Sequence, residues 1–211
     1  DTPLMINACA FQELTNLTTV TLNRVKYLGE GAFAKTGIAR ISLPATIEEI
    51  DKGCFQASAL EELTFIPSHV KINNKAFADC SKLKTIDMMV ESGVGVYDIG
   101  ESAFANCTAL TEFTVPASIT QMGKLAFSGC TSLSSVTIDN GAQYIGIQAF
   151  HGDPIEEIAI PASVTTMASA FKSHATLKKA VINCATVSSS TFSGCPVLSD
   201  VTFGDGVQTV G

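Results

Sequence analysis

The chain has 211 residues, of which 46% are apolar and 16% are charged, and its formal net charge is −7 at pH 7. This composition excludes an intrinsically disordered chain, which is poor in apolar residues and rich in charge. Thirteen lysines and arginines, spread along an acidic chain, exclude a concentrated basic patch, so we expect no nucleic-acid partner. No apolar run approaches the roughly 18 residues that span a bilayer, so we expect no membrane insertion by this segment.

A phenylalanine recurs along the chain at intervals of 21–27 residues, usually after an alanine. A unit of about 22 residues cannot bury its apolar side alone, so repeats of this length predict a stack in which each unit contacts its neighbours. We expect a single domain, residues 1–211, of about nine units, with the chain ending in the middle of a repeat. The recurring residues are Phe11, Phe33, Phe55, Phe77, Phe104, Phe127, Phe150, Phe171 and Phe192.

Within each unit the expected elements follow one another in the same order. An apolar residue stands five positions before the phenylalanine, and the next residue is usually Gly, Asn or Asp, which predicts a left-handed turn. The following Ala-Phe-x-x-Cys stretch predicts a short helical turn that places the phenylalanine in the core. A Leu-x-x-apolar-x-apolar pattern then predicts a half-buried strand, as at 17–22, 60–65, 110–115 and 133–138.

Stacked units would align these strands in a parallel ladder with a spacing of about 4.8 Å. The sequence therefore predicts an α/β repeat solenoid. One face would carry the parallel ladder, and the other would carry short strands, turns and helical turns.

Residues 99–116 follow the pattern I-G-x-x-A-F-x-x-C-x-x-L-x-x-I-x-I-P at its key positions. In this the sequence resembles the BspA-like, or Treponema pallidum-type, leucine-rich repeat family, and the resemblance covers essentially the whole chain. It implies a leucine-rich-repeat right-handed superhelix that is secreted or attached to the cell surface, commonly of host-associated bacteria or some protists. It also implies adhesion and protein binding without catalysis. The family pattern carries no catalytic residues, so none are transferred.

The longest interval, 27 residues, separates Phe77 from Phe104, and the excess lies in 89–97. Loops carry function more often than ladders do, so this segment, with Tyr97, is a candidate binding loop. The alternative is an insertion that the repeat merely tolerates.

Cysteine and histidine give no firm sign of a metal or cofactor site. Seven cysteines leave at least one thiol unpaired within the chain, and no Cys/His cluster has zinc spacing. A cysteine often stands three residues after the phenylalanine. After Phe33, Phe55 and Phe150 the unit is one residue shorter, and we interpret this position as the one that is missing. We expect Cys80, Cys107 and Cys130, on successive rungs, to form a column of small buried thiols, the alternative being a soft-metal column or an oxidisable ladder. In the remaining units that position holds Leu14, Cys80, Cys107, Cys130, His174 and Cys195.

The strand positions that face outward suggest the binding surface. In every second strand of the predicted ladder, the residue just before the central apolar residue is acidic. These acidic residues would lie about 10 Å apart, which is too far for several carboxylates to bind one Ca²⁺. We expect a solvated concave face, with ligand contact as the alternative. A second outward position is mostly threonine, which forms either a stabilising ladder or a recognition surface. The candidate protein-binding residues are Arg40, Glu62, Thr85, Asp87, Glu112, Thr114, Ser135, Thr137, Glu157 and, in the long loop, Tyr97.

No nucleophile-elbow, zinc-protease, phosphate-loop or dinucleotide pattern occurs, so we predict no enzyme and no cofactor. The best-supported function is binding of an extracellular or surface protein, as in adhesion to host or microbial proteins. Two alternatives are an inert spacer that presents another module and a carbohydrate-binding surface. The latter usually needs exposed aromatic rings, whereas this chain has no tryptophan and commits nine of its twelve phenylalanines to the repeat.

Overall fold

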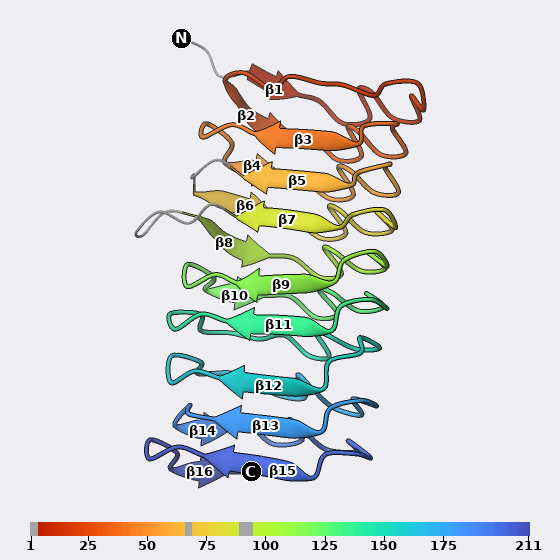
Figure 1. Cartoon of the computed structure of the whole chain (residues 1–211). Coiled ribbons are helices and arrows are strands. Elements are labelled where there is room, and N and C mark those ends of the chain that lie inside the picture. The colour runs from red at the N-terminus through yellow and green to blue at the C-terminus, as the bar shows by residue number, and fades with distance from the viewer. Residues whose placement is uncertain (1–3, 66–68, 89–94) are drawn as a thin grey trace.

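A computed structural model describes residues 4–65, 69–88 and 95–211 and shows coils stacked into an elongated solenoid (Figure 1). Strands on the near side of Figure 1, here called the front ladder, are β3 (Arg40–Leu43), β5 (Glu62–Phe65), β7 (Thr85–Met88), β9 (Glu112–Val115), β11 (Ser135–Ile138), β12 (Glu157–Ile160), β13 (Lys179–Ile182) and β15 (Asp200–Phe203). The back ladder comprises β1 (Leu4–Ile6), β2 (Val25–Leu28), β4 (Glu49–Ile50), β6 (Val70–Ile72), β8 (Val96–Ile99), β10 (Gln121–Met122), β14 (Thr186–Val187) and β16 (Thr209–Val210).

The front strands pair in parallel with the register that the repeat predicts. Arg40 pairs with Glu62, Glu62 with Thr85, and Glu112 with Ser135. Residues 19–22, however, form no strand, so the first predicted rung is wrong. Position in the repeat therefore fixes which residues are neighbours, but not whether every unit forms a strand.

The front ladder is interrupted twice, so the prediction of one continuous ladder is wrong. Strands β3, β5 and β7 form one sheet, β9 and β11 a second, and β12, β13 and β15 a third. The back ladder runs without a break from β1 to β10, past the level at which β7 and β9 fail to pair. We call the interruption between β7 and β9 the seam. The coils on its two sides remain joined at the back while they open at the front.

The described residues contain no helix, so the predicted α/β class and its helical turns are wrong. The segment around each core phenylalanine, here called the Phe turn, instead has left-handed residues two positions before and two positions after the ring. Around Phe104 these are Ser102 (φ 55°) and Asn106 (φ 60°). The N–H of Phe104 donates to the carbonyl of Ala126 (2.8 Å), and that of Ser102 donates to Lys124 (2.9 Å). Because the donors reach the next coil, the Phe turns form a third ladder.

The glycine that follows several back strands serves close packing and not the predicted left-handed turn. Gly123 lies outside the left-handed region. A Cβ there would lie 2.5 Å from the nitrogen of Glu101 and from the carbonyl carbon of Gly100 in the preceding coil. The backbones of neighbouring coils therefore touch at this point, and a side chain would hold them apart.

The phenylalanines stack through the core, as the repeat predicts. Successive rings from Phe11 to Phe192 lie 5.1–6.0 Å apart between centroids and are nearly parallel. All of those from Phe33 to Phe171 are fully buried. Aromatic pairs at this separation add about 0.5–1.5 kcal/mol beyond the burial of their area. The column therefore aligns each coil on the next as well as filling the core.

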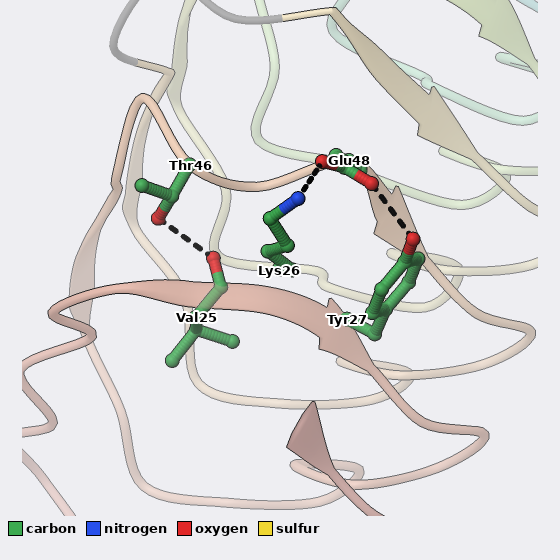
Figure 2. A network of polar contacts seen from close by, with 5 residues as sticks. All are labelled: Val25, Lys26, Tyr27, Thr46 and Glu48. Atoms are coloured by element: carbon green, nitrogen blue, oxygen red, sulfur yellow. Dashed lines mark hydrogen bonds and ion pairs between the residues drawn. The ribbon is translucent and has the colours of Figure 1, made fainter. Parts of the chain in front are cut away.

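Polar side chains also join neighbouring coils, as Figure 2 shows for β2 and the segment before β4. Glu48 accepts hydrogen bonds from Lys26 Nζ (2.5 Å) and Tyr27 Oη (2.7 Å), and Thr46 donates to the carbonyl of Val25 (2.9 Å). Both hydrogen bonds lower the pKa of Glu48, and the one from Lys26 has the larger effect. Exposed ion pairs of this kind contribute little because water screens them, so they support the stacking register more than the overall stability.

We expect Gly123→Ala to lower the free energy of unfolding by about 1–3 kcal/mol, because an added methyl group must displace the backbone of the preceding coil. Gly206→Ala is the matched control, since its Cβ would lie 3.4 Å from the Asn183 carbonyl oxygen, an ordinary contact. Urea unfolding followed by circular dichroism measures both. Equal stabilities of the two variants would contradict the close packing of coils at Gly123.

Candidate functional site

A groove of about 500 Å³ lies at the seam on the front face. Its walls come from β7 and β9, and β11 continues the wall on the β9 side. The structure brings together six of the ten predicted binding residues here: Thr85, Asp87, Glu112, Thr114, Ser135 and Thr137.

The floor of the groove is apolar because the core is less completely covered at β7 than elsewhere. Ile86 and Met88 point inward but are only half-buried, whereas the corresponding residues of β5, Leu63 and Phe65, are fully buried. Across the seam, Phe113 on β9 is 4% exposed and completes the floor. Without a paired neighbour strand, the inner side chains of β7 contact the groove.

The rim of the groove is acidic. Asp87, Glu112 and Asp139 line it, and their carboxylates make no hydrogen bond or ion pair with the described residues. Among the described lining residues the one cation, Lys84, is already bound to Glu61, with Nζ 2.9 Å from Oε2. The charge available to a ligand is therefore negative.

The other four predicted residues lie away from the groove. Arg40 Nε and Glu62 Oε2 are 3.0 Å apart and form an exposed ion pair across β3 and β5. Glu157 is exposed on β12, in a separate sheet. These three residues share the front face with the groove without lining it.

Tyr97 was predicted to lie in the long loop 89–97, but it is part of a strand, so its loop assignment is wrong. It belongs to β8 of the back ladder, where its ring stacks on His69 at 4.0 Å between centroids. Residues 89–94 of the predicted loop lie outside the described residues. Tyr97 therefore lies on a different ladder from the other candidates.

Sequence reasoning missed the apolar floor and two polar lining residues, Lys84 and Asp139. Ile86, Met88 and Phe113 occupy regular inward positions of their strands, so their pattern is that of ordinary core residues. The available signal was the 27-residue interval between Phe77 and Phe104, which marks the coil where the front ladder breaks.

A second feature is the column of residues three positions after each phenylalanine. Cys80, Cys107 and Cys130 are free and fully buried, which confirms the predicted column of buried thiols. Each donates a hydrogen bond to the carbonyl of the phenylalanine one coil earlier, as Cys80 does to Phe55 (3.1 Å). Burial raises the pKa of the Cys80 thiol to about 11, so it stays protonated and unreactive at neutral pH.

The column also includes three residues that the sequence interpretation placed outside it. The position three residues after the phenylalanine is present and buried in these units as well, where it holds Thr36, Ser58 and Asp153. The residue that these units lack therefore lies beyond this position in the chain. The hydroxyl of Ser58, for example, lies 3.4 Å from the sulfur of Cys80. Small polar side chains of several kinds therefore fill the column.

Asp153 and His174 sit in consecutive coils of this column without full hydrogen bonding. Oδ1 of Asp153 accepts a hydrogen bond from the Cys130 N–H (2.9 Å), but its Oδ2 and both ring nitrogens of His174 have no partner among the described residues. Burial raises the pKa of Asp153 to about 8 and lowers that of His174. Both groups are therefore mainly neutral at pH 7.

Across residues 4–65, 69–88 and 95–211, no group of three or more His, Cys, Asp or Glu side chains is arranged to hold a metal ion. The same ranges contain no helix able to span a bilayer.

The family profile described as BspA type Leucine rich repeat region matches six copies in this chain, over residues 2–94 and 97–211. No curated protein sequence matches the chain.

Solved structures show the same fold. A leucine-rich repeat protein from Bacteroides ovatus is similar over 98% of this chain, with a TM-score of 0.70 and 22% identity, and the chain spans 60% of that protein. A leucine rich cell surface protein from Faecalibacterium prausnitzii matches 95% of this chain and 69% of its own length (TM-score 0.52, 20% identity). The pneumococcal vaccine antigen PcpA matches 96% of this chain and 49% of its own length (TM-score 0.50, 21% identity). None of these proteins is named as an enzyme.

We expect Asp153 to make stability fall as the pH rises from about 4 to about 8. The unfolded chain releases this proton near pH 4, whereas the folded protein holds it to about pH 8, so folding becomes less favourable as pH rises through this window. The lowered pKa of His174 has the opposite effect on stability, and this effect ends near pH 7.5, about one unit above the ordinary histidine pKa of 6.5; it is the same in all three proteins compared below.

The loss would be at most about 1.4 kcal/mol per pH unit, the value for one proton. Asp153→Asn should abolish this slope, and Asp205→Asn, at an exposed position, should leave it unchanged. Urea unfolding at pH 6.5, 7.2 and 8.0 measures all three proteins. The same slope in the Asp153→Asn variant would contradict the assignment.

Proposed function

This chain belongs to the BspA-type leucine-rich repeat family, and we propose that it is a surface-exposed, non-catalytic module that binds another protein at the seam. The observation that carries the proposal is the groove between β7 and β9, which combines an apolar floor with an acidic, hydroxyl-bearing rim. Protein interfaces commonly have an apolar centre surrounded by polar residues. Adhesion to a host or microbial protein is the activity that fits such a module.

The groove favours a protein ligand over the two alternatives. A carbohydrate site usually offers an exposed aromatic face, but the one aromatic ring in the described lining, Phe113, is almost fully buried. An inert spacer needs no opening in its ladder. The three free carboxylates also disfavour nucleic acid, whose phosphates carry the same charge.

Names of similar proteins support an extracellular place of action. The Faecalibacterium prausnitzii protein is a cell surface protein, and PcpA is a vaccine antigen. We therefore propose that the chain acts outside the cell or on its surface, where protein ligands of hosts or other microbes are accessible.

The experiment measures capture of purified host and bacterial surface proteins by the immobilised chain, using biolayer interferometry. We expect at least one protein to bind, and Glu112→Lys to weaken that binding at least tenfold because the rim charge is reversed. Glu101→Lys is the matched control, since it places the same change on an exposed residue of the same coil outside the groove.

Failure of every protein to bind above a control surface would overturn the proposed function. Equal weakening by Glu112→Lys and Glu101→Lys would overturn the choice of the seam, since it would show a general charge effect.

A further inference from the structure

Two unpaired strand edges face each other across the groove. Strand β7 ends one front sheet and β9 ends the next, and no backbone hydrogen bond joins them in the described residues. In Figure 1 they lie at the level where β8 is visible behind the front ladder. An open strand edge presents N–H and C=O groups that can pair with an added strand.

The groove floor defines what such a strand would place inside. A strand directs alternate side chains to opposite faces of its sheet, so every second residue would point toward the floor. Ile86 and Met88 are half-buried there, and Phe113 borders the same space. Apolar side chains would cover these three residues and remove them from water.

The groove rim defines the outward residues of the same strand. These would lie beside Asp87 on β7 and Glu112 on β9, which occupy outward positions, and near Asp139. Since Lys84 is already paired with Glu61, nothing in the described lining offsets these carboxylates. Lysine or arginine would be favoured outward, and an acidic residue would be repelled.

We propose that the seam receives an extended segment of another protein, at least four residues long, in which apolar and basic residues alternate, and that it binds by strand addition to β7. The inference rests on the proposed function and adds the conformation and side-chain pattern of the partner. A second copy of this chain fits poorly, because the chain carries a formal net charge of −7 and would bring further negative charge to the acidic rim.

Synthetic peptides test the pattern directly. The probe is a capped seven-residue peptide in which lysine and valine alternate, with lysine at both ends, and fluorescence anisotropy at 150 mM salt measures its binding. Two controls have the same length: one contains the same residues in blocks, and the other has glutamate in place of lysine. We expect the alternating basic peptide to bind at least tenfold more tightly than either control.

Backbone methylation tests whether a strand is added. Alternate residues of a strand direct their N–H groups to opposite sides, so methylating either the valine or the lysine amides blocks one side. We expect at least one methylated peptide to lose tenfold or more in affinity. Hydrogen exchange of the protein should show slower exchange of amides in β7 on binding, with no change in β13.

Protein variants locate the site. Glu112→Lys should weaken the alternating peptide at least tenfold, and Glu101→Lys should leave its affinity within twofold. Equal affinity for the alternating and blocked peptides, insensitivity to both methylations, or unchanged exchange in β7 would each overturn strand addition.

The outcomes separate this inference from the proposed function. Capture of a folded protein that depends on Glu112, together with no binding of the alternating peptide, would overturn the strand addition and leave the proposed function standing. The alternating peptide could instead bind with the expected effects of residue order, methylation and Glu112→Lys, while the immobilised chain captures none of the purified surface proteins. This result would support the strand addition and count against the proposed function.

Discussion

Each coil of this protein depends on its neighbours to complete its backbone hydrogen bonds. The front strands, the back strands and the Phe turns all pair between coils, and no helix among the described residues satisfies its own backbone. A buried N–H or C=O without a partner is costly, so a coil of this kind is stable only within a stack. The phenylalanine column and the inter-coil ion pairs act on that stack by setting how one coil lies on the next.

The seam shows what happens when one of the three ladders is interrupted. The back strands still pair from β6 to β8, and the rings of Phe77 and Phe104 remain 5.1 Å apart, so the coils do not separate. Only the front opens, and it exposes part of the core beside unpaired strand edges. A rigid stack with a local opening can offer a preorganised binding surface, because little ordering is needed when a ligand arrives.

The repeat predicted from the sequence correctly placed the core phenylalanines, the parallel register of the front strands and the buried thiols. These features follow from side-chain pattern, which sequence shows directly. The Phe turn could not be recognised in the same way. Its left-handed positions are filled by residues as different as Leu125, Lys75 and Ser102, because the inter-coil hydrogen bonds and not the residue type hold that conformation. The candidate site was only partly predictable, since the outward residues were visible in the pattern but the missing pairing of β7 with β9 was not.

The three ladders also determine how the molecule would carry mechanical load. A pulling force along the stack acts parallel to the hydrogen bonds between coils, so the ladders of each junction resist it together. At the seam the front ladder contributes nothing among the described residues, and the back strands and the Phe turns carry the whole load. The seam, like the second interruption between β11 and β12, is therefore weaker under tension than a junction whose front strands are paired. A strand bound across both β7 and β9 would restore the missing load path and stiffen the molecule at its binding site.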